Sequence, residues 1–591
     1  MSENTDTPAT NIELEMLRNN KQDGYNYRER RHQDWTDNYE LYRDKVTINR
    51  LTQRQSVNLP LMKQSIRTLL KDVDDMPLIE FENLDNDKEA QIFKNEYWKY
   101  TVEHNRMELQ DIIDKKQVFF FGRSFDQWQV EDGKVKMTVQ DPMDILISRY
   151  ADPSNIHSSR YLIHTHIFKP LSEIERNPAY DQEAIKRLKE WYATEAGLIK
   201  SATNKKSLQE KNQKMADLGV SDIDDPVLGE TIVELSLHFV FRKESGDDEE
   251  QIYLYVECDD MEILQKSKLE DVIGITKTHY FRNHYPYVTW ADDVDRQDFW
   301  TDGVADIIRT PNKILNSWFS QLVENRTLRN FGMNYYDSTI EGFTPPANQD
   351  PVPGGWYPLP GKPSEVYQKV DVPDLSDSLD EMTFVIQMSE KATGATATQQ
   401  GVQTERKVTL GEVQLALGEA KERIKGMSKF YTQAWKDRGE MFNMLLEAAE
   451  DKLDSVKIYK KGKNTSDVYV REISPKDWKT ASGYTVKVWS QDEKNEKDMA
   501  QIEKIQTVST LIPGNPKLEE IKQRKLLEFA GLNPNEINDI LDLEKKKMEM
   551  INSMSNQMPI NTTQGIPQVQ NQILSPAPAI PNKKKVLEKV V

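Results

Sequence analysis

Hydrophobic positions form helical stripes along a central stretch that runs from Gly303 to about Glu450. Apolar residues spaced three, four or seven apart predict an amphipathic helix, because they share one face of a 3.6-residue turn. One stripe begins at Val304, a second follows Asp374, and a third, longer one extends to about Glu450. Pro311 after Thr310 predicts a kink or restart in the first helix. We expect the first two helices to pack through Ile307, Ile308, Leu315, Trp318, Leu322, Leu379, Met382 and Ile386.

Two segments without helical periodicity separate these helices. Residues 341–363 are dense in proline and glycine, which excludes a helix and most strand interiors. Residues 395–404 are small and polar and contain Gly401, so they predict a loop that anchors no core. The order is therefore helix, proline-rich excursion, helix, polar loop and long helix.

The first 300 residues mix helices with strands, which places the chain in the α+β class. Strict alternation of apolar residues predicts a hairpin that turns at Glu131–Gly133. A charged, apolar-poor segment at 198–226 predicts an exposed connector. We expect helices at 12–45, after Pro60 and at 87–116, and strands at 75–81, 125–130, 135–139, 233–241, 252–258 and 273–281.

The part of the chain after Glu450 predicts a small β-rich unit followed by polar helices. Three alternating runs, at 456–459, 467–473 and 484–489, indicate strands. Helical patterns follow at 492–511 and 517–554. Residues 556–591 are rich in Asn, Gln and Pro and predict a disordered tail.

Composition narrows the class of protein. A chain of 591 residues is expected to form several packed units or one elongated subunit. Its 78 Lys and Arg against 97 Asp and Glu give a net charge of −19, which argues against tight, extensive binding of a phosphate backbone. The alternative explanation of the negative net charge is that it only keeps the protein soluble. No apolar run is long enough to span a bilayer, the first residues lack signal-peptide character, and the single Cys258 suits a reducing compartment, so we expect assembly in the cytoplasm.

The sequence carries no recognisable catalytic motif. It has no phosphate-binding G-x-x-x-x-G-K-[ST] loop, no H-E-x-x-H and no nucleophile elbow. His164 and His166 are expected on one face of a strand, but without a third ligand they are better explained as surface or packed histidines. The acidic runs at 222–225 and 292–302 lack the spacing and glycine of a calcium loop. We therefore expect no enzyme, no cofactor and no metal.

The order of elements resembles the portal protein, or head-to-tail connector, of tailed bacteriophages. The segment from Thr393 to Gly411, with Gly401-Val402-Gln403-Thr404-Glu405-Arg406-Lys407-Val408-Thr409 entering a helix, is similar to the tunnel-loop region of podovirus-type portals. The resemblance implies an elongated subunit with a helical stem, a mixed α/β wing, a small clip and a helical crown, which assembles into a ring.

The resemblance also assigns each part of the chain a place in such a subunit. The parts are an N-terminal wing at 1–300, a first stem helix at 301–330, a clip at 331–371, a second stem helix at 372–393, a tunnel loop at 394–409, a long wing helix with a β-rich unit at 410–490, a crown at 491–555 and a tail at 556–591.

Two groups of candidate site residues follow from this assignment. Contacts of the clip with a partner are expected from three aromatic residues, Phe343, Trp356 and Tyr357, although packing on a neighbouring subunit explains them equally well. The DNA-facing residues of the tunnel loop are expected to be Gln399, Gln400, Gln403, Thr404, Arg406 and Lys407. For the last two, the first exposed turn of a helix is the alternative explanation.

The implied function is a ring at the capsid vertex through which double-stranded DNA is packaged and ejected. Its implied partners are further copies of the chain, usually twelve, the terminase packaging motor, a head-completion or tail adaptor protein, and the major capsid and scaffold proteins, with no membrane. The alternatives are another structural virion or scaffold protein without a DNA channel, and a nucleic-acid enzyme, against which the missing catalytic clusters count.

Overall fold

The computed structural model divides the chain into two compact units, Met1–Lys461 with Val468–Lys497, and Gly462–Asp467 with Asp498–Val591. All the elements treated below belong to the first unit. Of the second, the structure describes only short helical pieces within 499–527. The other described residues are 8–44, 57–72, 76–85, 87–217, 230–244, 247, 249–274, 279–295, 298–330, 334–336, 367–369, 375, 378–393, 410–461 and 468–489.

The largest sheet has five antiparallel strands in the order β4-β5-β6-β7-β8. All eight residues of β7 are buried, because side chains cover both faces of the sheet. On one face lies a small cluster that includes Leu17, Ile163 and Tyr255. The strands are β4 (Ile145–Ile147), β5 (Tyr161–Pro170), β6 (Ile232–Arg242), β7 (Gln251–Cys258) and β8 (Glu262–Lys268).

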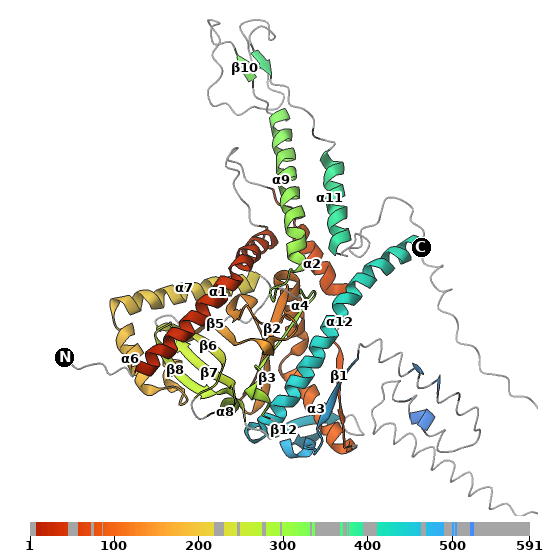
Figure 1. Ribbon diagram of the computed structural model, residues 1–591. Helices are drawn as coiled ribbons and strands as arrows, with labels where there is room; N and C mark the ends of the chain where they lie inside the picture. The colour runs from red at the N-terminus through yellow and green to blue at the C-terminus, as the bar shows by residue number, and fades with distance from the viewer. Residues whose placement is uncertain are drawn as a thin grey trace, which may run out of the picture. The chain divides into compact units, whose positions relative to one another are not determined.

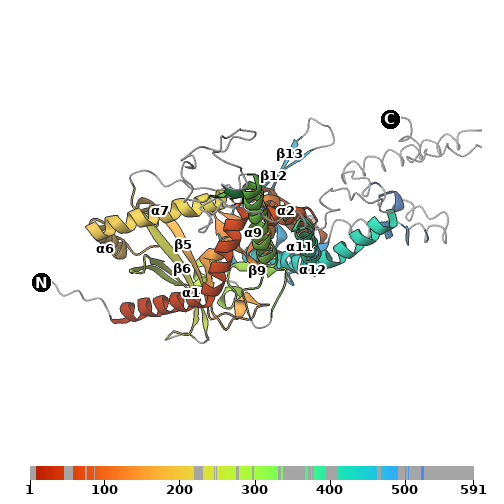
Figure 2. The same cartoon turned by 90° about the horizontal axis from the view of Figure 1, so that it is seen from above.

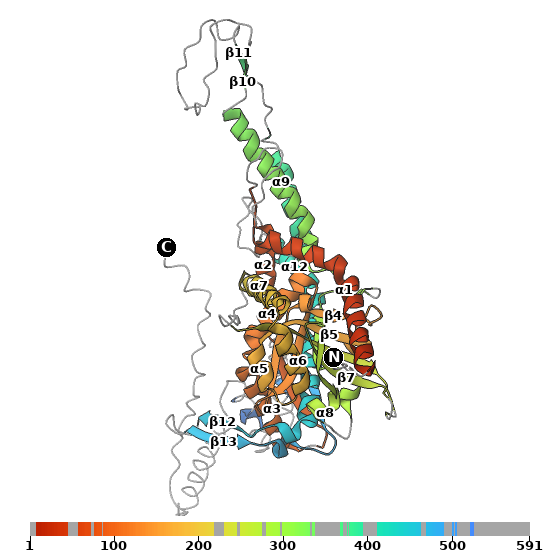
Figure 3. The same ribbon diagram turned by 90° about the vertical axis from the view of Figure 1, so that its left-hand side faces the viewer.

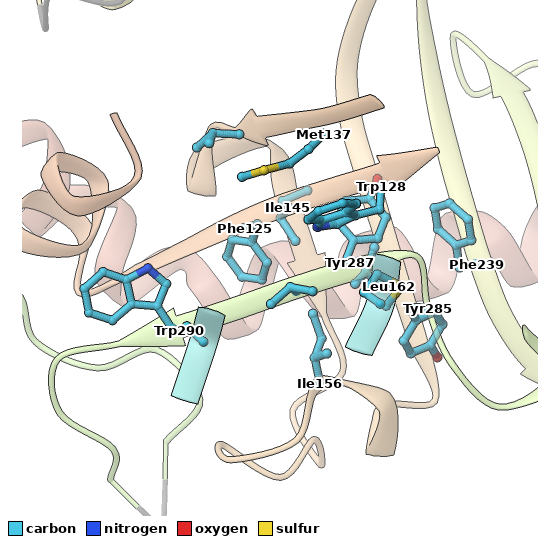
Figure 4. Close-up of a cluster of buried hydrophobic side chains, with 14 of the residues drawn as sticks. Phe125, Trp128, Met137, Ile145, Ile156, Leu162, Phe239, Tyr285, Tyr287 and Trp290 are labelled. Atoms are coloured by element: carbon cyan, nitrogen blue, oxygen red, sulfur yellow. The ribbon is translucent and has the colours of Figure 1, made fainter. Parts of the chain in front are cut away.

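A second sheet, of order β3-β2-β9, packs against the other face of the first (Figure 4). Strands β2 (Arg123–Glu131) and β3 (Lys134–Gln140) form the predicted hairpin, and β9 (Tyr287–Ala291) pairs with β2. Figure 4 shows side chains of the two sheets meeting in the core. Phe239 of β6 makes an edge contact with Tyr287 of β9, with ring centroids 5.6 Å apart. This core joins the two sheets into one body.

Helices cover the sheets on several sides (Figures 1 and 2). Helix α1 (Pro8–Tyr42) lies across the five-stranded sheet, where a Cβ atom at Gly24 would stand 2.9 Å from Leu146 Cβ. Helix α12 (Leu410–Ala448) packs on β2, β9 and β14. The remaining body helices are α2 (Leu61–Asp72), α3 (Lys88–His104), α4 (Met107–Phe121), α5 (Leu171–Arg176), α6 (Gln182–Tyr192), α7 (Glu195–Asp217) and α8 (Leu269–Ile273), with 3₁₀ turns η1 (Pro142–Asp144), η2 (Ile156–Ser158), η3 (Tyr280–Arg282), η4 (Glu450–Lys452) and η5 (Pro475–Trp478).

Two helices extend away from the sheets side by side (Figures 1 and 3). They are α9 (Val304–Asn330) and α11 (Ser378–Thr393), the first two helices that the stripes predict. Between them in sequence, β10 (Asn334–Tyr336) and β11 (Tyr367–Lys369) pair in an antiparallel ladder. The proline-rich excursion therefore leaves and returns through adjacent strands.

The predicted restart of the first helix at Pro311 does not occur. Helix α9 runs without interruption through Pro311, which is its eighth residue. Proline removes one intrahelical hydrogen bond, but the turns around it are tied to α1 by several side chains. These tertiary contacts keep the helix continuous where its local sequence favours a break.

The helix predicted over 87–116 is in fact two helices. Helix α3 ends at His104, and α4 begins at Met107 after Arg106, whose φ of 48° lies in the left-handed region. The break is held by Asn105, whose amide donates to Val135 O at 3.0 Å and whose Oδ1 accepts from Met137 N at 3.3 Å. A strand distant in the sequence thus ends the helix, and no local signal marks the break.

Two further expectations for the first 300 residues are wrong. The third strand beside β7 is Glu262–Lys268 and not 273–281. Of that predicted range, Ile273 is the last residue of helix α8, Tyr280 and Phe281 begin η3, and 275–278 lies outside the described residues. As an edge strand, β8 carries mostly polar residues, which hides the alternation. The predicted connector at 198–226 is mostly helix α7, and its residues 218–226 lie outside the described residues.

The polar composition of α7 misled the prediction because its polar groups are paired. Ser201 Oγ accepts from Ile232 N at 3.0 Å, and Lys214 Nζ lies 2.9 Å from the carboxylate of Asp141. Lys211 similarly lies 2.5 Å from the carboxylate of Asp144. A buried polar face satisfied in this way can cover a sheet without an apolar stripe.

The three C-terminal strands form as predicted but do not close one β-rich unit. Strands β12 (Val456–Lys461) and β13 (Val468–Ile473) pair with each other. Strand β14 (Tyr484–Trp489) instead pairs with β1 (Leu78–Asn83) near the other end of the sequence. Two parts of the first unit that are far apart in the sequence are therefore joined by a sheet.

Gly122, at the end of α4, packs against the segment that leads into α9. It caps α4 at φ 80°, and a Cβ atom there would stand 2.1 Å from Thr301 O. Gly483 has nearly the same φ, 81°, but its Cβ would meet only Glu447 Oε1, at 3.8 Å. The two positions share the backbone conformation that favours glycine and differ in the space around it.

We expect Gly122→Ala to lower the free energy of unfolding by several kcal/mol. Left-handed backbone costs about 1–2 kcal/mol for a residue with a Cβ, and the clash with Thr301 O adds to it. Gly483→Ala is the control and should cost about 1 kcal/mol only. Chemical denaturation of both variants measures the difference, and equal values for the two would contradict the close packing at Gly122.

Candidate functional site

The stem formed by α9 and α11 contains the eight apolar residues predicted to pack it. Ile308 and Leu315 are fully buried and Met382 is 5% exposed. Trp318 and Ile386 are half-buried and pack against the same hydrophobic cluster, and Leu322 is half-buried. Ile307 and Leu379, in contrast, are 47% and 51% exposed. The structure thus brings five of these residues into one cluster and leaves two on the surface.

Further apolar side chains of the stem are exposed within the chain. On α11, Phe384 and Met388 are 62% and 50% exposed and lie one turn apart on the side opposite Met382. On α9, Ile314 is 38% exposed and shares a face with Ile307, seven residues before it. Each stem helix therefore has an apolar stripe that the described part of the chain does not cover.

The base of α9 is tied to α1 by a row of charged and polar pairs. Arg31 of α1 pairs with Asp302, and Arg309 of α9 lies 2.8 Å from Asp34. Further along, Lys313 Nζ lies 2.6 Å from Asp37 Oδ2, and the hydrogen bond to Lys313 lowers the pKa of Asp37. These pairs fix the direction in which the stem leaves the body.

Below the stem, α12 is held by a buried ionic cluster. Arg438 is fully buried, and its guanidinium lies 2.7 Å from Asp114 of α4 and 2.6 Å from Asp126 of β2. Trp290 Nε1 donates to Asp114 at 2.5 Å. Beside it, Asp111 accepts from Tyr431 OH at 2.6 Å and lies 2.7 Å from Lys115 Nζ. The cluster connects α12 with α4, β2 and β9.

The charges of this cluster determine which groups hold protons. Three carboxylates face two cations in a dry interior, where an uncompensated charge is costly. Burial raises the pKa of Asp126 to about 8, although the charge of Arg438 opposes this rise. Burial alone would lower the pKa of Arg438, but Asp114 and Asp126 raise it. Burial therefore favours the protonated form of Asp126, whereas Arg438 favours its charged form.

The two histidines predicted to share a strand face lie on opposite faces. His164 Nδ1 lies 3.1 Å from Tyr287 OH in the main core, and burial lowers the pKa of His164 to about 3. His166 lies 3.3 Å from Tyr25 OH of α1 and 2.9 Å from Glu234. The register of β5 shifts between His164 and Ile167, and the φ of His166 is 57°. This bulge turns His166 to the other face.

A pocket of about 320 Å³ lies between α12, β9 and η2. Its lining includes His157, His284, Asp437 and Glu440. His157 Nδ1 accepts from Tyr285 N at 3.1 Å, and burial together with His284 lowers the pKa of His157 to about 3. Throughout the described part of the chain, no group of three His, Cys, Asp or Glu side chains is arranged to hold a metal.

The predicted tunnel-loop and clip residues lie outside the described residues. This applies to Gln399, Gln400, Gln403, Thr404, Arg406 and Lys407, and to Phe343, Trp356 and Tyr357. The helices before and after the loop, α11 and α12, are present at the predicted places. The roles assigned to these nine residues stay predictions.

Sequence reasoning missed the cluster around Arg438. The usable signal was the placement of Asp111, Asp114 and Lys115 within a helix that ends in three phenylalanines, where charged residues are buried only with partners. The partner Arg438 is more than 300 residues away, and no local pattern points to it.

A family model described as the phage SU10 portal protein matches residues 55–571 of the chain. This range covers most of the chain and contains both stem helices, α12 and every strand that the structure describes. The chain belongs to this family of phage portal proteins. The resemblance to tailed-phage portals, predicted from the order of the helices, is thereby confirmed. A comparison with curated proteins gave no match.

Membership in the portal family gives the chain a structural role at the capsid vertex of a phage virion. The mixed α+β architecture, with several antiparallel sheets and a protruding helical pair, agrees with a portal-type subunit. Within the described part of the portal chain, no helix is both long enough and apolar enough to cross a membrane.

We expect replacement of Arg438 by methionine to destabilise the portal subunit by about 3–5 kcal/mol. The substitution leaves Asp114 and Asp126 buried without their shared cation, and an unpaired buried charge has this cost. Lys436→Met on the same helix is the control, because Lys436 is 46% exposed and its pair with Glu440 is at 3.9 Å. That control should change stability by at most about 0.5 kcal/mol. Chemical denaturation measures both, and similar values would exclude the cluster as the anchor of α12.

Proposed function

We propose that this portal chain assembles into a closed ring, usually of twelve subunits in portals, through which double-stranded DNA is packaged and later ejected. Family membership supports the portal role. The observation that carries the proposal is the pair of uncovered apolar stripes on the stem, Phe384 with Met388 on α11 and Ile307 with Ile314 on α9. Exposed apolar stripes on a protruding helix pair favour contact with further copies.

The arrangement of the stripes suits a ring. They lie on two different helices, so the α11 stripe of one subunit can meet the α9 stripe of the next. Such a head-to-tail contact uses two different surfaces. It closes into a ring when the rotation between neighbouring subunits divides a full turn into a whole number of steps. A single self-complementary patch would instead end at a dimer.

The parts of the subunit take the roles implied by the portal family. We assign the wing to 1–300, the stem to 301–330 and 372–393, the clip to 331–371, the tunnel loop to 394–409, the wing helix with its β-rich unit to 410–490, the crown to 491–555 and the tail to 556–591. In this assignment the clip meets the terminase motor during packaging and then the tail adaptor. The ring assembles in the host cytoplasm together with capsid and scaffold proteins.

We expect the purified chain to form rings with a central hole in negative-stain images and a matching mass by light scattering. Phe384→Asp with Met388→Asp should shift the protein to monomers, because each introduced carboxylate would have to be buried in the contact. Leu198→Asp with Ile199→Asp is the control, since these residues of α7 are equally exposed, at 60% and 62%, but lie off the stem. A wild-type chain that stays monomeric over a wide concentration range would refute the ring.

We expect the tunnel loop to contact DNA without gripping it. Its Thr and Gln side chains exchange hydrogen bonds with water and phosphate at similar cost, and Arg406 with Lys407 repeats as a small positive girdle. In a packaging assay, Arg406→Ala with Lys407→Ala, and separately a deletion of 395–400, should leave ring assembly intact and reduce DNA filling or retention. Wild-type packaging by both variants would remove the loop from the mechanism.

A further inference from the structure

Helix α2 presents a row of cations on the side opposite its buried face. Lys63, Arg67 and Lys71 follow one another at four-residue intervals, so they share one stripe. Arg67 and Lys71 are exposed and Lys63 is half-buried, whereas Met62, Ile66 and Leu69 on the other side are fully buried. The row is therefore accessible while the helix itself is firmly packed.

Two of these cations, Lys63 and Arg67, lie close to the buried Tyr42 together with a third cation, Lys116 of α4. Lys63 Nζ lies 5.8 Å and Lys116 Nζ 5.4 Å from the centroid of the Tyr42 ring. Burial raises the pKa of the Tyr42 hydroxyl, and the nearby charge of Arg67 opposes this rise. Tyr42 is itself held by an edge contact with Phe120, at 5.8 Å between ring centroids. Three helices, α1, α2 and α4, thus fix three cations around one ring.

Within the described part of the chain, the cations of this cluster lack carboxylate partners. None of the ion pairs among the described residues includes Lys63, Arg67, Lys71 or Lys116. Burial, followed by the charges of Arg67 and Lys63, lowers the pKa of Lys116 to about 8, and no described carboxylate acts in the opposite direction. Like charges held this close destabilise one another. The arrangement is therefore unfavourable until an anion joins it.

Several other buried or half-buried cations of the protein have carboxylate partners, whereas Arg28, Lys94 and Arg123 are buried and donate to uncharged oxygens. Lys211 and Lys214 of α7 each pair with an aspartate, at 2.5 and 2.9 Å. Arg438 has two carboxylates. The site on α2 differs from these single cations because three positive charges lie close together without a carboxylate, in a chain with 97 acidic residues and a net charge of −19.

The place of α2 in the fold suggests which anion is available. Helix α2 packs against α9 and α4, and in Figures 1 and 2 it lies beside the base of the stem near the end of α11. Thr393, the last residue of α11, directly precedes the segment 394–409 that we assign to the DNA-facing loop. A cation cluster at this position lies near the proposed path of the duplex.

We propose that Lys63, Arg67 and Lys116, with Lys71 beside them, form a phosphate-binding site for the DNA backbone. This inference rests on the proposed function, because it identifies a duplex as the source of the phosphate. The site would contact backbone phosphates through charge, with no reading of bases, as Lys and Arg do in sequence-independent binding. In a ring it would repeat with each subunit and supplement the girdle assigned to Arg406 and Lys407.

The test compares two full-length variants with the same change of charge. The site variant carries Lys63→Gln, Arg67→Gln and Lys116→Gln. The control carries Lys99→Gln, Lys186→Gln and Lys476→Gln, three exposed lysines on α3, α6 and η5. The affinity of each protein for a short labelled duplex is measured by fluorescence anisotropy between about 50 and 200 mM salt. Ring formation and the melting temperature without DNA are recorded in parallel.

We expect the site variant to bind the duplex at least about tenfold more weakly than the control. The slope of log affinity against log salt should also be shallower, by about 0.9 for each phosphate that the variant no longer neutralises. The site variant should keep its rings and melt no lower than the control.

Equal affinities and slopes for the two variants would overturn the site. Disruption of rings only in the site variant would also overturn it, because the cations would then be meeting carboxylates of a neighbouring copy. Absence of rings in the wild type, with the affinity difference retained, would refute the ring and leave the site standing.

Discussion

The fold depends most on the buried contact of Arg438 with Asp114 and Asp126. Three elements meet there, α12, α4 and β2, and each contributes one fully buried ionisable side chain. A buried pair of this kind adds little stability compared with an apolar substitute, but it tolerates no displaced partner. It therefore selects one register of α12 against the sheet. Because α12 directly follows the loop assigned to the channel, this register also sets where that loop ends.

The portal subunit treats its charges in two ways. Inside the body, many cations are matched with carboxylates, as in the pairs of α7 with Asp141 and Asp144 and in the contacts between α1 and the base of α9. These pairs disfavour other packing arrangements of the elements more than they stabilise the fold, since exposed pairs contribute at most about 1 kcal/mol each. On α2 the cations have no such partners among the residues that the structure describes. A mainly acidic protein with a small uncompensated basic site can attract a duplex locally and repel it elsewhere, which suits a polymer that must move past the surface.

The stem shows how one helix pair can serve both the subunit and an assembly. Leu315 and Met382 are buried within the chain, whereas Phe384 and Ile307 remain on the surface. A helix that packs on one neighbour needs only a narrow apolar stripe, so a second stripe on another face calls for a second neighbour. The ionic contacts at the base of α9 hold the direction of the pair without using either stripe.

The sequence by itself determined the local elements and, through their order, the family. Periodicity placed α9, α11 and α12, and alternation around Asp132-Gly133 placed the hairpin of β2 and β3, because these signals lie within a few turns or strands of the chain. It also selected Ile308, Leu315 and Met382 as stem residues, but it could not separate them from the exposed Ile307 and Leu379, since that depends on which neighbour covers each face. Only the tertiary structure decided the pairing of β14 with β1, the break at Asn105, the turn of His166 to the other sheet face, the burial of the polar face of α7, and the meeting of Arg438 with Asp114. Each of these depends on a partner far away in the sequence, and a buried polar group gives no periodic signal until that partner satisfies it.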